Sequence, residues 1–416
     1  MAKSFMFALL FAYLDPGSGS ALVGTLIAVG GAAIFSLKSF FYRLLRKDMT
    51  SRESAKAAED IAIFSEGKNY WGTFRLIVEE LISRKVHFSY YTMDLHDPAL
   101  LIDSDYIHAK LFDHRKVASF HKLSNIKAKV LLATTPNIGT GGYPVKRSPH
   151  VMKMFHVFHA FADCSAYHIG SLDNYDTVLT VGPHQEKPIR EVEKARGLKE
   201  KDLIPAGLPY FDAQYNSLCA TASRSAGTVN KPTVLVAPSW GAKGCLAEYG
   251  VDFLCALARA DYTVIVRPHP QSYIAEPQFI EEYKSKTSQY VNIVWDAETV
   301  GTVSMEKSDI LISDTSSIRF DYAFLYGKPV ITLDIPRTKQ TEYEGQYQSE
   351  IWTDSAAVRI GRVLDHSTVS NLIQTVEEVL KSGSESVREF RDATITNLGS
   401  SAKAIVDVMI REVSNV

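Results

Sequence analysis

Residues 308–337 constrain the fold more than any other stretch of this chain. A short apolar run at residues 310–312 is typical of a strand buried on both faces of a parallel sheet. Apolar residues then recur at helical spacing over residues 318–326, and Gly327 stands where such a helix would end. A second apolar run follows at residues 330–333. The stretch therefore predicts a strand–helix–strand unit of an α/β fold.

Small polar residues, 314–317, separate the predicted strand from the predicted helix. In such a unit the first helical turn lies at the carboxyl edge of the sheet, and its free N–H groups bind anions, most often phosphate. Ser and Thr also begin helices that hold no ligand. The local pattern leaves both interpretations open.

Composition narrows the class of protein. A chain of 416 residues with 46% hydrophobic residues has room for two or three domains with sizeable cores. The net charge is −2, so no basic field indicates a nucleic-acid partner. The 4 cysteines lack metal-type spacing and are interpreted as free thiols of a reducing compartment. No carboxylate cluster has metal-ligand spacing, so we predict neither a metal nor a cofactor.

The N-terminus is interpreted as a membrane anchor over residues 1–47. Residues 5–14 and 21–37 are apolar, and basic residues follow at positions 38, 43, 46 and 47. The second run is at the lower limit for a spanning helix, and the positive charges after it hold that end in the cytoplasm. The first run suits one half of a hairpin. A cleaved signal peptide is less favoured, because the charge follows the apolar stretch.

Strands and helices alternate through residues 48–219, which predicts a first α/β domain with a parallel sheet. The expected strands are residues 61–64, 87–91, 129–133, 154–160, 175–181 and 202–205, and the expected helices are residues 73–83, about 105–112 and 183–196. A polar link at residues 220–231 marks the domain boundary.

Residues 220–416 are predicted to form a second Rossmann-like domain. Its expected strands are residues 233–237, 262–266, 291–294, 309–313 and 330–333, with helices near residues 245–260, 318–326 and 386–413. The last helix is far enough along the chain to cross back over the first domain.

Three loops of the second domain follow predicted strands and should converge. They carry Ser239, the pair Arg267 and His269, and residues 314–317. Ligands of such sheets bind outside the carboxyl ends of the strands. Arginine offers a planar fork for phosphate oxygens, and histidine can donate a hydrogen bond or carry a proton. A rigid surface turn between prolines is the alternative interpretation.

The sequence resembles the CDP-glycerol glycerophosphotransferase family, the teichoic-acid primases and polymerases. The likeness rests on Arg-Pro-His-Pro from Arg267, on Ser-Asp-Thr-Ser-Ser from Ser313, and on Asp321. It extends to residues 175–181, 207–209, Asp212 and 234–240, and covers roughly residues 129–337. The resemblance implies a GT-B architecture of two Rossmann-like domains at the cytoplasmic face of the membrane. It also implies transfer of glycerol phosphate from CDP-glycerol to a lipid-linked acceptor, with release of CMP.

The resemblance also assigns roles to residues. His269 would bind the donor phosphates or assist the leaving group, Arg267 would support it, and the three hydroxyl residues 315–317 would hold the diphosphate. Asp321 would be structural or would bind donor hydroxyls. The predicted catalytic residues are thus His159 and His269, and the predicted substrate-binding residues are Arg267, Ser239, Ser313, Asp314, Thr315, Ser316, Ser317 and Asp321.

The acceptor side departs from the family pattern. His159 stands where the family has the His of His-Gly-Thr-Pro, the proposed general base, but Ala160, Phe161 and Ala162 replace the three following residues. A buried structural role for His159, or a role for His156 instead, stays open. Gly241 also replaces the polar residue that the family often has there.

The leading hypothesis is a membrane-anchored transferase of a phosphopolyol from a CDP-activated donor to a lipid-linked or glycan acceptor, in cell-surface polymer biosynthesis. A GT-B glycosyltransferase or a nucleotide-sugar epimerase is the enzymatic alternative. A family member that binds a nucleotide or a glycan-lipid without turnover is the alternative from another class. The polyol, the acceptor, the number of units added and the oligomeric state are left open by the sequence.

Overall fold

The computed structural model describes residues 59–113, 115–140, 143–221, 232–241, 244–297, 302–335, 350–382 and 385–416. The chain divides into a unit of residues 1–58 and a compact unit of residues 59–416. The predicted membrane anchor, residues 1–47, lies outside the described residues. Among the residues that are described, no helix is long and apolar enough to cross a membrane. Everything below concerns the second unit.

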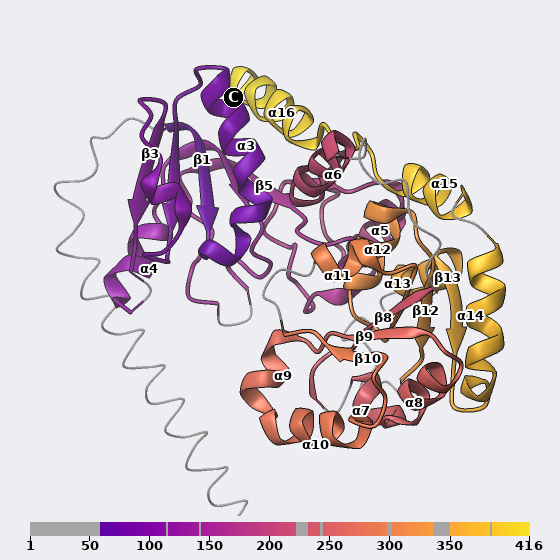
Figure 1. The fold of residues 1–416 in the computed structure, drawn as a ribbon. Helices are drawn as coiled ribbons and strands as arrows, with labels where there is room; N and C mark the ends of the chain where they lie inside the picture. The colour runs from indigo at the N-terminus through magenta and orange to yellow at the C-terminus, as the bar shows by residue number, and fades with distance from the viewer. Residues whose placement is uncertain are drawn as a thin grey trace, which may run out of the picture. The chain divides into compact units, whose positions relative to one another are not determined.

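The first sheet has seven parallel strands in the order β3-β2-β1-β4-β5-β6-β7 (Figure 1). The strands are β1 Glu59–Ser65, β2 Phe88–Thr92, β3 Ile107–Leu111, β4 Ala128–Ala133, β5 Val151–Val157, β6 Thr177–Thr180 and β7 Asp202–Pro205. The direction in which strands are added reverses between β1 and β4, where a ligand crevice is expected in a doubly wound sheet.

The helices of the first sheet are α3 Trp71–Ser83, α4 Val117–Leu123, α5 Glu186–Arg196 and α6 Pro209–Thr221. Short 3-10 turns lie at η1 Lys68–Tyr70, η2 Pro98–Leu101, η3 Cys164–Ala166 and η4 Pro183–Gln185. Helix α3 buries Phe74, Ile77, Val78 and Leu81. Their spacing of three and four residues places them on one face, which packs on the sheet.

The second sheet has six parallel strands in the order β10-β9-β8-β11-β12-β13. The strands are β8 Thr233–Ala237, β9 Thr263–Val266, β10 Ile293–Trp295, β11 Ile310–Ser313, β12 Val330–Leu333 and β13 Gly361–Leu364. Its switch point lies between β8 and β11, whose residues are fully or almost fully buried except Thr233.

Ten helices are described after β8. They are α7 Cys245–Tyr249, α8 Asp252–Arg259, α9 Pro270–Ala275, α10 Pro277–Thr287, α11 Thr302–Lys307, α12 Ile318–Tyr326, α13 Trp352–Arg359, α14 Leu372–Lys381, α15 Glu385–Thr394 and α16 Ser401–Asn415, with a 3-10 turn at η7 Val369–Asn371. The α/β class with two doubly wound parallel sheets is thus confirmed.

One predicted helix is wrong, and two others are each divided into two helices in the structure. The helix expected at residues 105–112 is strand β3, in which Ile107, Ala109 and Leu111 alternate with His108 and Lys110 at the sheet edge. That period of two belongs to a strand. The helix expected at residues 245–260 is divided into α7 and α8, because Gly250 takes a positive φ of 67°.

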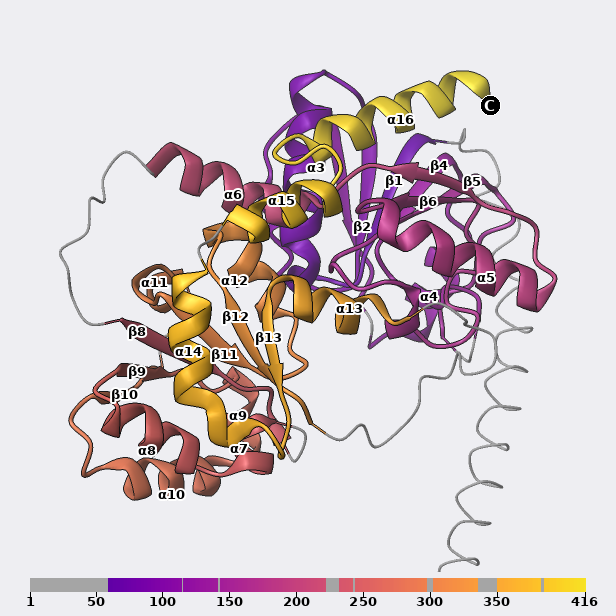
Figure 2. The same cartoon turned by 90° about the vertical axis from the view of Figure 1, so that its right-hand side faces the viewer.

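The end of the chain packs on the first sheet. The helix expected at residues 386–413 is two helices, α15 and α16. Asp212, which is fully buried in α6, accepts the N–H groups of Gly399 at 2.7 Å and Ser401 at 2.6 Å, and so fixes the start of α16. Helix α16 then lies on α3, β4 and β1 (Figure 2). Strand β13 and helices α13 and α14 were not predicted.

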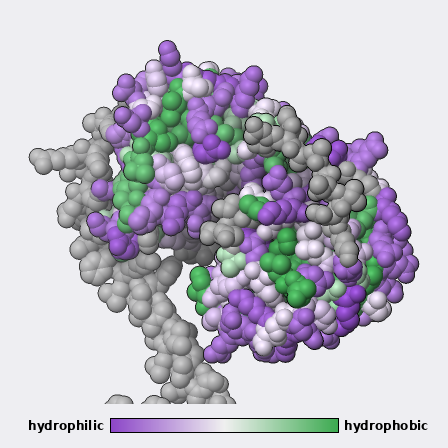
Figure 3. All heavy atoms as spheres, in the orientation of Figure 1, coloured by the Kyte–Doolittle hydropathy of each residue, from purple (hydrophilic) through white to green (hydrophobic). Residues whose placement is uncertain are grey.

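Side chains from the two sheets share one hydrophobic cluster, which includes Phe161, Phe211, Phe320, Phe324 and Trp352. Helices α6 and α12 meet there. On the face seen in Figure 3, hydrophobic residues form separate patches between hydrophilic ones.

Candidate active site

A buried carboxylate organises the carboxyl edge of the second sheet. Asp314, the residue after β11, is fully buried. Its Oδ2 accepts the N–H groups of Ser239 and Cys245, each at 2.8 Å, and its Oδ1 accepts the Ser239 hydroxyl at 2.5 Å and the Ser316 N–H at 3.1 Å. The bonds from Ser239 and Cys245 tie the chain after β8 to the loop after β11, and the Ser316 bond lies within that second loop. Asp314 and Ser239 therefore shape this edge of the sheet.

Hydroxyl groups at the start of α12 divide into a buried and an accessible set. Ser313 is fully buried, and its hydroxyl donates to the carbonyl of Ala237 at 2.5 Å across the switch point. Thr315 and Ser317 are exposed, and Ser316 is half-buried. The accessible hydroxyls stand beside the N–H groups of the first helical turn, where an anion is favoured.

The loop after β9 holds its arginine and its histidine differently. The Arg267 guanidinium donates to the Asp296 carboxylate at 2.8 Å, and each of the two side chains is 10% exposed. His269 is exposed and caps α9, because its Nδ1 accepts the Gln271 N–H at 3.1 Å. A neutral ring that accepts at Nδ1 carries its proton on Nε2. His269 therefore presents a donor to solvent, while Arg267 fixes the loop.

A second group of polar residues lies at the carboxyl edge of the first sheet. His159 follows β5 and is half-buried, and its Nδ1 is 2.9 Å from the hydroxyl oxygen of Thr134, which follows β4. Burial lowers the pKa of His159, while the Glu66 carboxylate and the Thr134 hydrogen bond act to raise it. Glu66 follows β1 and accepts the Tyr143 hydroxyl at 2.5 Å.

His156 occupies a different environment from His159. It is fully buried inside β5, among the rings of Phe158, Tyr167 and Tyr175, with its Nε2 at 3.1 Å from the Tyr167 hydroxyl. Burial, together with repulsion from His159, lowers the pKa of His156 to about 3. His156 is thus neutral at physiological pH and out of reach of a substrate, which leaves His159 as the candidate base.

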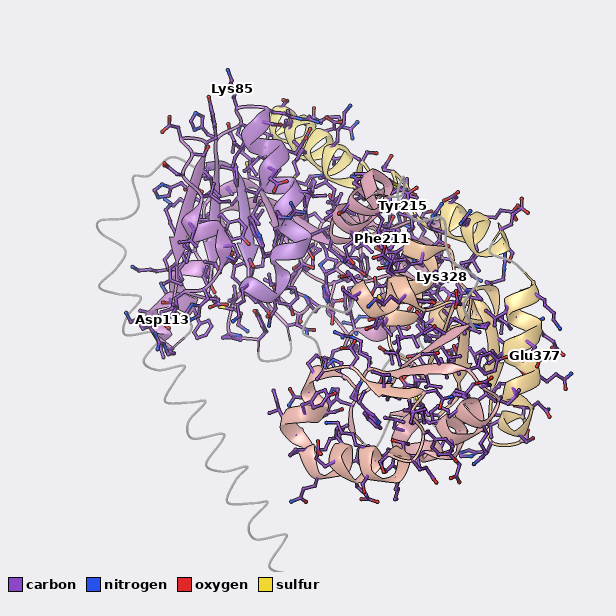
Figure 4. All side chains as sticks on the ribbon, in the orientation of Figure 1. Lys85, Asp113, Phe211, Tyr215, Lys328 and Glu377 are labelled. Atoms are coloured by element: carbon purple, nitrogen blue, oxygen red, sulfur yellow. The ribbon has the colours of Figure 1, made fainter. Side chains whose placement is uncertain are left out.

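Phe161, one of the residues that stand in place of the family's Gly-Thr-Pro after His159, joins the two sheets. The Phe161 side chain is 1% exposed, and its ring lies 6.3 Å from that of Phe320 and 5.1 Å from that of Phe324, both in α12. It also contacts Phe211 of α6, which Figure 4 labels together with Tyr215. Phe161 is two residues from His159, and Phe320 is three residues from Ser317. This ring contact therefore joins the segment after β5 to helix α12.

Asp321 belongs to the same junction. Its Oδ1 accepts the Tyr210 hydroxyl of α6 at 2.6 Å, and burial raises the pKa of the Asp321 carboxyl to about 6. Nearby, Asp163 accepts the Trp352 N–H at 3.0 Å, and the Trp352 ring packs on the His184 ring with centroids 4.3 Å apart. These contacts support a structural role for Asp321.

All of the predicted site residues lie at two carboxyl edges or at the junction that joins them, and their roles in binding and catalysis stay predictions. Four residues beside His159 were not predicted, namely Glu66, Tyr70, Thr134 and Tyr143. The signal that could have found Glu66 and Thr134 is their position directly after predicted strands. Within the described ranges, no group of three or more His, Cys, Asp or Glu side chains is placed to hold a metal ion.

Comparison with known proteins agrees with this geometry. The sequence model of the CDP-Glycerol:Poly(glycerophosphate) glycerophosphotransferase family matches residues 152–398, which is more than half of the chain. The chain is 23% identical over 326 residues to the teichoic acid ribitol-phosphate polymerase TarK of Staphylococcus aureus. That match covers 73% of this chain and 60% of the length of the relative.

Two solved structures show the same fold. The wall teichoic acid polymerase TagF, in a substituted form soaked with CDPG, has a TM-score of 0.55 at 16% identity, covering 91% of this chain and 97% of that one. The UDP-GlcNAc 2-epimerase of Neisseria meningitidis, bound to UDP-GlcNAc, has a TM-score of 0.55 at 13% identity, covering 85% of this chain and 100% of that one. The predicted GT-B-like α/β fold with two parallel, doubly wound sheets is confirmed. From the extent of the family match, the chain belongs to the CDP-glycerol:poly(glycerophosphate) glycerophosphotransferase family.

Proposed function

We propose that this protein transfers a phosphopolyol, glycerol phosphate or ribitol phosphate, from a CDP-activated donor to a hydroxyl of a lipid-linked or glycan acceptor. The observation that carries the proposal is the contact of Phe161 with Phe320. It joins the segment after β5, which holds the half-buried His159, to helix α12, whose first turn is the predicted phosphate site. Family membership and the TagF likeness support a CDP-linked donor.

The donor side rests on charge and hydrogen bonding. The first turn of α12 offers N–H groups and the accessible hydroxyls of Thr315 and Ser317 to the diphosphate. His269 Nε2–H adds a donor from the facing loop, which Arg267 holds in place through Asp296. Donors aimed at the bridging and terminal oxygens stabilise the charge that develops on the departing CMP.

The acceptor side rests on His159. Its Nδ1 is engaged by Thr134, so Nε2 is the nitrogen that takes the proton of the acceptor hydroxyl. The acceptor oxygen then forms a bond to the phosphorus that carries the polyol. The bond from that phosphorus to the oxygen shared with CMP breaks, and CMP leaves with the bonding electrons. One proton moves to His159, and nothing is oxidised or reduced.

We further infer that residues 1–47 hold the protein at the cytoplasmic membrane, with the two Rossmann-like domains in the cytoplasm. The support is the uncharged run at residues 21–37 and the basic residues directly after it. Extraction of cell membranes with alkaline carbonate tests this inference. A protein that is integral to the membrane stays in the pellet, and release into the supernatant would contradict the anchor.

Nucleotide release is the test of the transfer reaction. The full chain in vesicles is given CDP-glycerol, CDP-ribitol, and UDP- and GDP-sugars, with a membrane lipid extract as acceptor. We expect CMP from a CDP-polyol, and a loss of at least about a hundredfold in His269→Asn. Asparagine keeps the bond to the Gln271 N–H that caps α9 but removes the Nε2 donor.

The matched control is His150→Asn. His150 is exposed and precedes β5, at the opposite edge of the first sheet from His159. We expect this change to leave CMP release intact. Release of UDP or GDP instead would assign the protein to the sugar-nucleotide enzymes, and tight binding of a nucleotide without turnover would favour a non-catalytic family member.

A further inference from the structure

The turn after β1 holds Glu66 in one direction. The Ser65 hydroxyl oxygen accepts the Gly67 N–H at 3.1 Å, and the Lys68 N–H donates to Asp94 at 3.2 Å. Gly67 has a φ of 142°, and a Cβ there would lie 2.4 Å from the Cβ of Asp94. Only glycine fits such a turn, since a side chain would clash and the backbone angle is unfavourable for L-residues. The chain thus fixes how the Glu66 side chain leaves the sheet edge.

The same turn brings Tyr70 onto the ring of His159. The Tyr70 N–H donates to the Gly67 carbonyl at 3.0 Å, and the Tyr70 ring meets the His159 ring edge-on with centroids 5.3 Å apart. Burial raises the pKa of Tyr70, and the Glu66 carboxylate raises it further. Glu66 therefore acts on both members of this ring pair.

The groups that face His159 are known from each element packed against it. Tyr70 belongs to η1, Thr134 follows β4, Glu66 follows β1, and His156 lies on its own strand. Tyr70 is neutral near pH 7 because its pKa is raised above 10, and His156 is neutral because its pKa is about 3. Of these groups, Glu66 is the carboxylate, and it acts to raise the pKa of His159.

We propose that Glu66 is a positioning residue for His159, whose carboxylate stabilises the imidazolium formed when His159 takes the acceptor proton. The proposal rests on the proposed transfer reaction. During the step the proton moves from the acceptor oxygen to His159 Nε2, and the Nδ1–H of the charged ring donates to Thr134. A carboxylate nearby favours the charged form of the ring and so increases its strength as a base. Glu66 and Thr134 both precede residue 152, where the family match begins.

A purely structural role is the competing explanation, because the Tyr143–Glu66 bond also ties the loop after β4 to β1. Two variants separate the roles. Glu66→Gln keeps an oxygen that accepts from Tyr143 and removes the charge. Tyr143→Phe removes the bond and keeps the charge.

The measurement is a pH titration of the His159 ring, followed by NMR on the full chain with ¹⁵N-labelled histidine and without substrate. The His159 resonance is the one that is lost in His159→Asn. We expect Glu66→Gln to lower the pKa of His159, and Glu66→Asp and Tyr143→Phe to shift it less. In turnover assays, Glu66→Gln should lower kcat about tenfold, with the KM for the CDP-polyol unchanged and the acidic limb of kcat/KM moved to lower pH.

Three outcomes decide between a positioning role and a purely structural role for Glu66, and between failure of this proposal and failure of the proposed function. An unchanged titration in Glu66→Gln overturns the proposal. A shift in Tyr143→Phe as large as that in Glu66→Gln also overturns it, because the loop contact would then be the cause. The third outcome is that the pKa of His159 shifts in Glu66→Gln and not in Tyr143→Phe, while the wild-type protein releases no CMP from any CDP-polyol. This outcome supports the pairing of Glu66 with His159 and overturns the proposed function.

Discussion

Asp314→Asn tests whether the carboxylate at the switch point organises the donor edge. The substitution preserves size and replaces one carboxylate oxygen by an NH2 group. Both oxygens of Asp314 accept from backbone N–H groups, namely those of Ser239 and Cys245 at Oδ2 and that of Ser316 at Oδ1. In either orientation, the NH2 group of an asparagine at this position therefore faces at least one backbone N–H group, which is also a donor. The Ser239 hydroxyl can rotate to accept, so it does not decide the outcome.

The magnitude follows from these bonds. A hydrogen bond to a charged group contributes about 1.5–3 kcal/mol, and a neutral one about 0.5–1.5 kcal/mol. Three bonds lose their charge assistance, at about 1 kcal/mol each, and the partly buried Ser316 N–H loses its acceptor, at about 1 kcal/mol. The smaller cost of burying a neutral amide in place of a carboxylate offsets part of this loss. We expect the free energy of unfolding to fall by about 3 kcal/mol.

Urea unfolding followed by circular dichroism measures the change, and titration with the CDP-polyol measures donor binding. Asp314→Asn should lower both stability and donor affinity. Thr315→Ala, an exposed residue next in sequence, should lower donor affinity alone. A loss of stability below about 1 kcal/mol in Asp314→Asn would refute the assignment, since the four bonds to this buried carboxylate could not then depend on its charge.

Three further predictions concern the first sheet and the junction. Because burial lowers the pKa of His159 below its ordinary 6.5, the acidic limb of kcat/KM for the acceptor should lie below pH 6.5. This limb should vanish in His159→Asn and persist in His156→Gln. Loss of the limb in His156→Gln would contradict the assignment of His159 as the base. Burial raises the pKa of Asp321 from 3.8 to about 6, so the folded state binds this proton more tightly and wild-type stability falls as pH rises through that window. Asp321→Asn should therefore be about 1–3 kcal/mol more stable than wild type at pH 7 in urea unfolding, with the difference shrinking toward pH 4, and a constant difference would contradict the linkage. Phe161→Thr restores one residue of the family motif and empties a buried site that four aromatic rings surround. It should lower the free energy of unfolding by about 3–5 kcal/mol in the same assay. A loss under about 1 kcal/mol would show that the cluster closes around the smaller side chain.

The positions of the strands near the two switch points could be predicted from the sequence. Strands β1, β4, β8, β11 and β12 are apolar runs that are buried on both faces, and their signal is local. The edge strand β3 is short and half polar, so its local pattern does not distinguish a strand from a helix. The loops that carry Ser239, His269 and Thr315 could be predicted for the same reason, since each directly follows a buried strand.

The sequence by itself determined the α/β alternation, the residues that follow each strand and the resemblance at Arg267–Pro270 and Ser313–Ser317. Only the tertiary structure decided what those residues contact. Asp314 meets Ser239 across 75 positions of sequence, and Tyr143 meets Glu66 across 77. No periodicity or motif encodes such pairs, because the partners are brought together by strand order, and strand order is set by the packing of helices on both faces of each sheet. The same packing turned the altered motif at Phe161 into a contact between the segment after β5 and helix α12.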